Sequence, residues 1–577
     1  MIRDTLKHIS VILNKKERAG LKLYFFLFLT LSILEAASVG LIPAFFTILI
    51  DKNLLLSKFE FSPDFYLFLK NIINKDNIIL QFTILILIFF VIKAIYTMLF
   101  YIYEAKLFNK FKIRMSSSLF KIYLNKNYLF HSKNNPLILG RNMSSEINTT
   151  VYYIRSFILI IKEFIQIFLI GLILIFGNLK ISVSIFFLLT LAAFIYLKMF
   201  SGKLSEKSKI SFFERGEKSK IINQILNAII EVKLYSKSEY FIKKFTNSIK
   251  REFQSKVYMD IISKLPKISI ELLIVIIVCL SIILAMSFNF HLDVIIPTIA
   301  LYFFAAIRVY PSINNILLNR LSLVRDKVSL SKISNEFQNS EKDVEPKDVS
   351  QENFDFNSVI QLKNLSFIYN NRDPIFENIN LEINKSDTIG IVGETGSGKS
   401  TLMKIIMGLI DPSGGSISID GKNINKIRKS WQKQIGYVPQ NFYLFDDTIF
   451  ENIIFGEDSE KVNVQKVNKV IEDSFLEKFI NNLPKKVDTL IGPNAKQISG
   501  GQAQRLAIAR ALYQETNFLI FDEATSSVDV KTENEIIQNI YSLKNKKTLV
   551  IITHKESLLN GCNKIFRIKN KQLIKVK

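Results

Sequence analysis

A glycine-rich segment carries the clearest chemistry in the sequence. Residues 393–400 fit the pattern G-x-x-x-x-G-K-[ST], in which glycines let backbone N–H groups converge on phosphate oxygens. Lys399 adds positive charge at the β- and γ-phosphates, and the hydroxyl of Ser400 can ligate Mg²⁺. The strand expected at 387–392 and the helix expected from Thr401 are the context that this pattern requires. We therefore predict a nucleotide site at Gly393, Glu394, Thr395, Gly396, Ser397, Gly398, Lys399, Ser400 and Thr401.

Two carboxylates follow a second apolar segment, residues 518–521. We expect Asp522 to hold Mg²⁺ through water, and Glu523 to orient and deprotonate the attacking water. The alternative is a pair of solvated acids at the end of a strand. The glycine-rich segment in the same domain favours the catalytic interpretation, because the two features together make up a hydrolytic site.

His554 ends a third apolar segment, residues 549–553, and is one of only four histidines. A single histidine at the end of a strand is more often structural than catalytic. The residue types alone therefore leave its role open.

An α/β domain is needed to position these residues. From Ser358 onward, short β-rich segments alternate with helical ones, which is typical of a parallel sheet covered by helices. Residues 358–577 are enough to enclose a core of their own. The polar and acidic stretch 336–357 predicts a linker before this domain.

The first 335 residues predict a helical membrane domain. A helix needs roughly 20 apolar residues to cross a bilayer, and six such segments are more than an ordinary soluble core contains. The predicted fold is therefore an α-helical membrane domain with six spans followed by an α/β P-loop ATPase domain. The spans are expected at about 21–50, 78–103, 157–176, 181–199, 268–288 and 294–312.

The distribution of Lys and Arg predicts the orientation of these spans. Of the net charge of +24, +18 lies in residues 1–357. The basic residues gather in 1–20, 104–156 and 198–267, which we place on the cytoplasmic side together with both termini. The positive charge therefore reflects membrane topology, and nucleic acid is not expected as a partner.

The loops between the spans differ in length and pattern. The two long cytoplasmic connections show helical spacing, for example at Ile225, Ile229 and Val232, and are expected to extend the membrane helices. The first outside loop, 51–77, contains a segment at 63–70 that could form a short helix. This helix could lie at the membrane interface or pack on the protein surface.

Composition excludes several other classes of protein. An apolar fraction of 49% excludes a disordered chain. The two cysteines, Cys279 and Cys562, support neither a disulfide scaffold nor a Cys-rich metal site.

The C-terminal domain resembles the ATP-binding cassette (ABC) transporter family over residues 358–577. Residues 498–502, Ile-Ser-Gly-Gly-Gln, are similar to the family's signature motif, and 526–529 are similar to its D-loop. The resemblance implies that Tyr369 stacks on adenine and that His554 is the switch histidine. It also implies that Gln440 senses the γ-phosphate and joins Ser400 and Asp522 as a Mg²⁺ ligand. The further nucleotide-binding residues it implies are Ser499, Gly500, Gly501, Gln502 and Asp529.

The whole chain also resembles ABC exporters, which combine six helices, two long cytoplasmic connections and a C-terminal cassette. Such a chain is a half-transporter. In the family, ATP lies between the P-loop of one cassette and the signature of the other, so Ser499 and Gly501 would serve the partner's nucleotide. Both half-sites look intact here, which implies a homodimer.

Three positions depart from the family pattern. Ile498 replaces the usual Leu, which is a nearly isosteric change. Ser527 stands where Ala is common. Pro493 replaces the Glu of a segment that communicates with the membrane part in the family, which puts that charge contact in doubt but not hydrolysis.

Charged side chains inside membrane spans are costly and often functional. Lys93 and Arg308 lie within expected spans and Lys267 lies at the edge of one, without an evident acidic partner nearby in the sequence. They could meet an anionic group of a substrate. Alternatively, they could snorkel or pair with helix neighbours such as Glu35 or Glu271. Adjacent Lys162 and Glu163 are more readily explained by pairing between helices.

Short stretches around Glu35, Lys93, Lys267 and Arg308 are similar to ABC-type flippases of bacterial lipid-linked oligosaccharides. This resemblance implies an anionic polyprenyl-diphosphate glycan as substrate, moved across the bacterial cytoplasmic membrane. The alternatives are an exporter of peptides, lipids or drugs, and an ATP-gated regulator without transport. We expect no room for an N-terminal protease domain of the kind that peptide exporters carry. Retention of Glu523 and of the signature disfavours a regulator.

Overall fold

The computed structural model describes most of the chain. It leaves out residues 1, 51–77, 178–197, 200–201, 204–205, 208, 212, 288–291, 345–353, 370–372, 493–496 and 525–529. The helix considered at 63–70 and nearly all of the expected span at 181–199 lie outside the described residues. The chain divides into two compact units. The first contains Met1–Leu124 and Asn134–Lys342, and the second contains Asn125–Lys133 and Asp343–Lys577.

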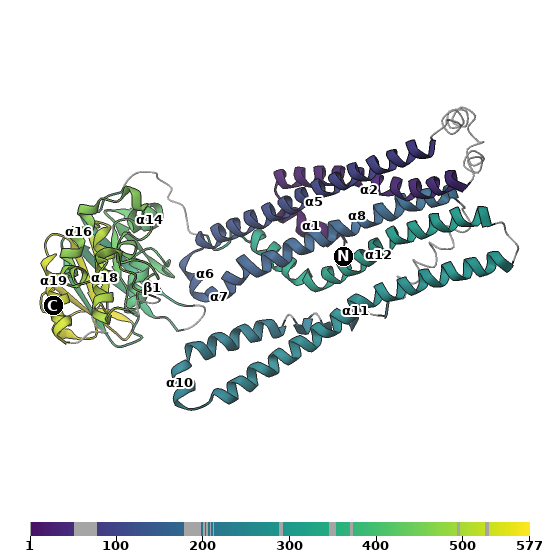
Figure 1. The fold of residues 1–577 in the computed structure, drawn as a ribbon. Coiled ribbons are helices and arrows are strands. Elements are labelled where there is room, and N and C mark those ends of the chain that lie inside the picture. The colour runs from purple at the N-terminus through teal and green to yellow at the C-terminus, as the bar shows by residue number, and fades with distance from the viewer. Residues whose placement is uncertain are drawn as a thin grey trace. The chain divides into compact units, whose positions relative to one another are not determined.

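Long helices make up the first unit (Figure 1). Three described helical stretches, Lys15–Phe45, Ile79–Leu124 and Pro136–Leu174, are long and apolar enough to cross a membrane. Helix is also found over the described parts of the spans expected at 268–288 and 294–312. The elements are α1 (Ile2–Ile12), α2 (Lys15–Ile50), α5 (Ile78–Leu124), α7 (Pro136–Arg141), the π-helical η1 (Asn142–Glu146), α8 (Ile147–Gly177), α10 (Ile229–Leu234), α11 (Ser238–Ser287) and α12 (Leu292–Gln338).

Four of the described helices of this unit, α2, α5, α8 and α12, form a bundle. α8 and α12 lie side by side, and α2 packs against α5, α8 and α12. Small and β-branched residues at the centre, including Ala36, Val39 and Ala305, let the helices approach closely.

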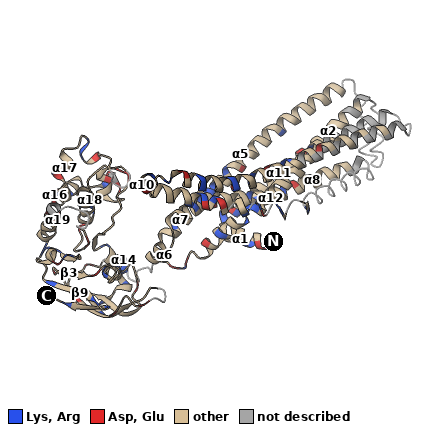
Figure 2. Cartoon of the chain, turned by 90° about the horizontal axis from the view of Figure 1, so that it is seen from below, with Lys and Arg blue, Asp and Glu red and all other residues tan. Residues whose placement is uncertain are grey.

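Charged residues concentrate toward the end of the helical unit that carries α7 and α10, whereas the described part of the opposite end is mostly uncharged (Figure 2). Buried acids at the charged end are paired with cations. The Glu17 carboxylate lies 2.6 Å from Arg114, and the Glu252 carboxylate lies 2.6 Å from Lys218. This segregation agrees with the positive-inside pattern of the sequence.

A helical hairpin extends from the bundle, with α10 near its tip and α11 as its long second arm (Figure 1). Its first arm includes the helical residues 213–227. Polar pairs hold the arms together, because Glu214 lies 3.3 Å from Arg251 and accepts a 2.9 Å hydrogen bond from Ser248.

A six-stranded sheet forms the centre of the second unit. Its strand order is β10-β9-β3-β8-β7-β6, and all neighbours are parallel except β9 and β10. β3, β7 and β8 are almost continuously buried, as their apolar sequences require. The strands are β3 (Thr388–Gly393), β6 (Ile435–Val438), β7 (Phe518–Asp522), β8 (Thr548–Ile552), β9 (Lys564–Lys569) and β10 (Gln572–Lys575).

A smaller antiparallel sheet, in the order β2-β1-β4-β5, completes the β structure. It consists of β1 (Val359–Phe367), β2 (Phe376–Asn384), β4 (Gly414–Ile419) and β5 (Lys422–Asn423). One apolar core joins this sheet to one face of the central sheet, and a second core covers the other face. The helices are α13 (Lys399–Ile406), α14 (Ile424–Gln432), α15 (Ile449–Ile454), η2 (Ser459–Lys461), α16 (Val464–Asp473), α17 (Glu477–Asn481), η3 (Lys486–Asp488), α18 (Gly500–Tyr513), α19 (Val530–Ser542) and η5 (Glu556–Leu559).

A short segment from the first half of the sequence belongs to this second unit. Residues 125–133 include α6 (Tyr128–Lys133). Lys126 bridges to Val344, and the Asn127 N–H donates to the Asp343 carbonyl at 2.7 Å. Tyr128 and Leu129 pack against the core that joins the two sheets. A connection between two long helices is therefore part of the α/β unit.

Candidate functional site

The topology of the central sheet brings the predicted catalytic residues together. β3, β8, β7 and β6 are adjacent and parallel, so their carboxyl ends lie along one edge of the sheet. β3 leads into the glycine-rich loop and β7 ends in Asp522. His554 follows β8 and Gln440 follows β6. Four segments that are far apart in the sequence thus meet at one edge.

The glycine-rich loop has the backbone that its sequence predicts. Gly396 and Gly398 adopt positive φ angles of 85° and 99°. A Cβ atom at Gly398 would come within 2.5 Å of Ile375, so no other residue fits there. The Lys399 ammonium donates to the carbonyls of Gly393 and Glu394 at 2.8 and 2.9 Å. The lysine therefore lies directly across the loop that is expected to hold phosphates.

Asp522 is buried between two hydroxyl groups. Its Oδ1 accepts from Ser400 and its Oδ2 accepts from Tyr437, both at 3.3 Å. Burial raises the pKa of the Asp522 carboxyl above its ordinary value, although both hydrogen bonds act in the opposite direction. Ser400 and Asp522, which the sequence assigns to Mg²⁺, are thus in direct contact.

Glu523 lies beside Gln440. The Gln440 amide donates to the Glu523 carboxylate at 2.5 Å. Glu523 has a φ angle of +50°, which is uncommon for a residue with a side chain. Its N–H donates to the Ile552 carbonyl at 2.9 Å, which fixes the residue at the end of β7. The carboxylate is therefore held at the sheet edge rather than free in solvent.

Two further predicted residues lie near these strands. His554 is exposed just after β8. Tyr369 is half-buried and meets Phe367 edge to face, with 4.6 Å between ring centres. Phe367 thus fixes the orientation of the aromatic ring that is expected to stack on adenine.

The signature segment begins α18. Ser499 is the N-cap of this helix and forms a reciprocal capping box with Gln502. Ser499 and Gly500 are exposed, and Gly501 is half-buried. The first turn of α18 therefore presents its N-terminal end at the surface, where it can meet an anion from outside this unit.

Two important contacts were not expected from the sequence. One is the hydrogen bond from Tyr437 to Asp522, because no sequence motif assigns a role to the Tyr437 side chain. The other is Arg510 on α18, which donates to Asn452 and to the Tyr443 carbonyl at 2.8 Å. The Arg510 guanidinium lies 4.5 Å from the Phe455 ring centre, and burial lowers its pKa to about 10. It therefore links the helix of the signature to the segment that follows Gln440.

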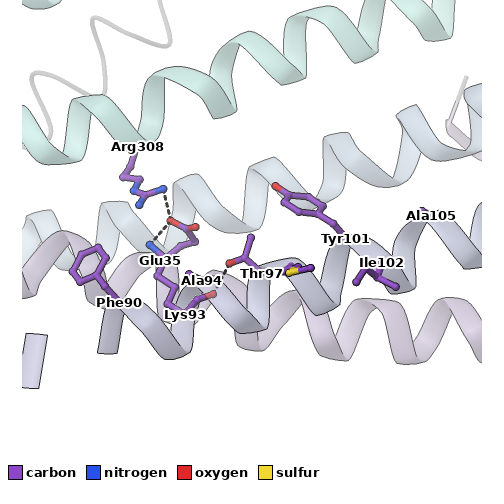
Figure 3. Close-up of a pocket in the computed structure, with 10 residues that line it drawn as sticks. Glu35, Phe90, Lys93, Ala94, Thr97, Tyr101, Ile102, Ala105 and Arg308 are labelled. Atoms are coloured by element: carbon purple, nitrogen blue, oxygen red, sulfur yellow. Dashed lines mark hydrogen bonds and ion pairs between the residues drawn. The ribbon is translucent and has the colours of Figure 1, made fainter. Parts of the chain in front are cut away.

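A charged cluster lies inside the helical unit (Figure 3). Glu35 on α2 stands between Lys93 on α5 and Arg308 on α12, with one carboxylate oxygen 3.0 Å from the lysine and 2.8 Å from the arginine. Lys93 also donates to Ser38 at 2.9 Å. The acidic partner that the local sequence does not reveal is thus supplied by another helix.

The adjacent residues Lys162 and Glu163 on α8 have environments that differ from that of the Glu35 cluster. Lys162 is buried, and its ammonium lies 5.3–5.8 Å from the ring centres of Phe28, Phe100 and Tyr101. Glu163 accepts a 3.1 Å hydrogen bond from Asn315. Both side chains therefore contact other helices.

Several predicted positions lie outside the described residues. They are Pro493 and the D-loop positions Ser526, Ser527 and Asp529. Lys267 lies within α11, but its side chain is not described.

Comparison with known proteins identifies the second unit. The family described as "ABC transporter" matches residues 376–526, the region that holds the glycine-rich loop, the signature and both carboxylates. The chain carries an ABC transporter domain. The glycine-rich loop, the signature segment and the two carboxylates fall within one domain of this family.

Curated relatives match a little more than a third of the chain. The ATP-dependent lipid A-core flippase of Idiomarina loihiensis is 37% identical over 217 residues, which is 37% of each protein. A processing and transport ATP-binding protein for lactococcin G, from Lactococcus lactis, is 37% identical over 211 residues, covering 36% of this chain and 30% of that protein. The chain therefore matches little more than a third of the length of the flippase.

The chain as a whole resembles a solved ABC exporter in fold. A bacterial Atm1-family ABC exporter with ATP bound superimposes with a TM-score of 0.76 at 18% identity, over 96% of this chain and 95% of that one. At this identity the likeness establishes the fold only. The chain thus has an ABC exporter fold, with membrane helices followed by an ABC ATPase domain, as the sequence predicts.

Proposed function

We propose that this chain is an ATP-driven exporter or flippase of phosphate-bearing lipids, and most specifically of a lipid-linked oligosaccharide carried on a polyprenyl diphosphate. The observation that carries this substrate class is the convergence of Lys93 and Arg308 on a single carboxylate within the membrane helices. Two cations against one acid leave a positive excess, which an anionic substrate can neutralise. The relatives named as lipid A-core flippases point to the same class.

The site residues support ATP hydrolysis as the energy source. Glu523 would take a proton from water, and its hydrogen bond with Gln440 supports this role, because Gln440 would sense the γ-phosphate. Lys399 and the loop N–H groups would bind the β- and γ-phosphates. His554, which follows β8 between β3 and β7, would contact the γ-phosphate.

The side chains of Ser400, Asp522 and Gln440 offer the kinds of ligand that Mg²⁺ binds. A hydroxyl and a carboxylate oxygen are the hard ligands that this ion prefers, and Ser400 and Asp522 already touch. Gln440 can supply a third oxygen. When bound, the ion would neutralise charge on the β- and γ-phosphates.

We also propose a homodimer in the cytoplasmic membrane, with the ATPase domain and both termini in the cytoplasm. The exposed N-terminal end of α18 supports the dimer, because its signature residues are free to meet a nucleotide held by a second chain. The charged end of the helical unit supports the orientation.

Reconstituted flipping would test the substrate. The full-length protein in proteoliposomes should move a fluorescent polyprenyl-diphosphate glycan in an ATP-dependent manner, and faster than a neutral phospholipid or a peptide. Lys93→Gln, Lys267→Gln and Arg308→Gln should slow this movement while basal ATP hydrolysis and dimerisation persist. Lys244→Gln, an exposed lysine on α11, is the matched control. Wild-type flipping by all three variants would refute the anionic-substrate proposal, and preferential export of the peptide would replace it with the peptide alternative.

A further inference from the structure

The charged cluster opens into an elongated cavity of about 740 Å³. Phe90 and Lys93 mark one end of its lining and Ala105 the other, all on α5 (Figure 3). At 1.5 Å per helical residue, the lining extends over about 22 Å. Apart from Glu35, Lys93 and Arg308, the lining consists of apolar and aromatic side chains with one threonine. The cavity therefore has a charged end and an apolar remainder. This combination suits an amphiphile with an anionic head group.

The charges at this end do not balance. Lys93 and Arg308 contribute two positive charges, and Glu35 contributes one negative charge. Lys93 is almost fully buried, whereas Arg308 is partly exposed toward the cavity. Lys93 lies on α5 and Arg308 on α12, so Glu35 on α2 links all three helices through its two ion pairs.

Glu35 is an imperfect partner for the two cations. The same oxygen, Oε2, faces both of them, and this buried oxygen makes no well-directed hydrogen bond. A guanidinium is best neutralised by a group that presents two oxygens to its fork. A phosphate offers those oxygens, and it can contact both cations without sharing one atom.

We propose that Glu35 is an exchangeable counter-ion, which holds the lysine and the arginine until the phosphate of a lipid head group takes its place. This inference rests on the proposed anionic substrate and adds the residue that substitutes for that substrate in the empty transporter. Substrate binding then loosens the tie between α2 and the other two helices, because the cations turn from Glu35 to the ligand. The same exchange in reverse favours release of the phosphate on the far side of the membrane.

A charge series tests the exchange. The cluster carries a net charge of +1 in the wild type, +2 in Glu35→Gln, 0 in Lys93→Gln and again +1 in the double variant. The full-length protein is placed in nanodiscs of phosphatidylcholine with or without phosphatidic acid, and thermal unfolding and phosphatidic acid binding are measured. Glu104→Gln is the matched control, because Glu104 is also a buried acid, paired with Arg155 at 2.6 Å, but lies outside the cavity.

The expected result is a graded response to the lipid phosphate. Glu35→Gln should unfold several degrees lower in phosphatidylcholine alone, because two cations are left without their acid. Phosphatidic acid should restore that loss and bind about tenfold more tightly than to the wild type. The double variant should respond like the wild type, and Lys93→Gln should respond least. Glu104→Gln should lose stability that the lipid does not restore.

Several outcomes would overturn the inference. One is equal restoration of Glu35→Gln and Glu104→Gln, which would indicate a general effect of the lipid. Another is unchanged lipid affinity across the charge series. If Glu35→Gln does not fold, the comparison of Lys93→Gln with the double variant still tests the inference. The double variant must bind phosphatidic acid more tightly than Lys93→Gln does. If lipid affinity does not follow the charge series but the glycan lipid is flipped normally, the counter-ion inference is wrong and the proposed function stands. If lipid affinity follows the series but the glycan lipid is not flipped, the phosphate site stands and that substrate is refuted.

Discussion

At the scale of single residues, the candidate ATP site depends on how its two carboxylates are held. Asp522 is buried between two hydroxyls, and Glu523 is held by an amide at the sheet edge. Adjacent carboxylates thus have separate environments, one suited to a metal ion and the other to proton transfer. Their separation arises from the strand end, where the positive φ of Glu523 turns its side chain away from its neighbour.

Glu523→Gln should keep ATP binding and nearly abolish turnover. The amide cannot accept a proton from water, and loss of a general base costs about 10²–10⁴-fold in rate. ATP hydrolysis and nucleotide binding by the purified protein would check this, with Glu515→Gln, an exposed acid of the same domain, as control. Near-normal hydrolysis in Glu523→Gln would remove this residue from the role of base.

Tyr437→Phe should raise the Mg²⁺ concentration that nucleotide binding requires. The change removes only the hydroxyl that donates to Asp522, so the carboxylate loses one of the two groups that orient it. A neutral hydrogen bond contributes about 0.5–1.5 kcal/mol, which corresponds to a several-fold higher Mg²⁺ concentration for half-maximal ATP binding. Binding of ATP without the metal should be unchanged. An unaltered Mg²⁺ titration would show that Ser400 alone positions the carboxylate.

The sequence predicted the P-loop and both carboxylates because their chemistry is written in consecutive residues. Tyr437 was missed as a contact because its partner lies 85 positions away, and only the strand order places β6 beside β7. For the same reason the sequence left the pairing of Lys93 and Arg308 with Glu35 as one alternative among several, and the packing of α2 against α5 and α12 brings the three side chains together. Contacts between helices or strands depend on packing angle and register, which local patterns do not determine.

At the scale of elements, α6 is the feature that hydropathy did not reveal. The connection 104–156 was expected to be a helical extension, but α5 ends at Leu124 and a separate short helix follows. The cluster of Asn125, Asn127, Asn134 and Asn135 is the signal that could have predicted the interruption, since Asn favours turns and caps. Asn135 indeed caps α7, which begins at Pro136. By contrast, the helical character of the membrane unit followed directly from its apolar runs.

Tyr128→Ala should release α6 from the ATPase domain. The Tyr128 ring packs against the core of the second unit and lies 5.1 Å from the Lys404 ammonium. Loss of the half-buried ring should cost about 1–3 kcal/mol of local packing. We expect faster amide exchange in 125–133 and more ATP consumed for each substrate moved, with basal hydrolysis retained. Ser132→Ala, on the same short helix, is the control. Unchanged exchange in Tyr128→Ala would show that the ring does not hold this segment.

At the scale of the whole molecule, the ABC domain contains a complete P-loop and a complete signature in one chain, yet they belong to different elements. The P-loop precedes α13, whereas the signature begins α18 and exposes its first residues. A chain that used both on one nucleotide would need them to face each other within the domain. A chain that pairs with a copy of itself would instead form two equivalent composite sites.

Mixed dimers of two variants distinguish a signature that acts within its own chain from one that acts on the partner's P-loop. One chain carries Lys399→Ala, which removes the charge that binds phosphate. The other carries Gly501→Asp, which places a carboxylate at the N-terminal end of α18, where anions should bind. If the signature acts on the partner's P-loop, both lesions fall in one site and the second site stays intact, so each mixed dimer should bind one nucleotide. If each signature serves its own P-loop, the lesions fall in separate sites and none stays intact. Unmixed dimers of either variant damage both sites and are the controls. Binding of two nucleotides, or of none, would therefore contradict a composite site. Binding of one nucleotide would establish that each signature acts on the P-loop of the partner chain, and that the chain forms the homodimer which this arrangement requires.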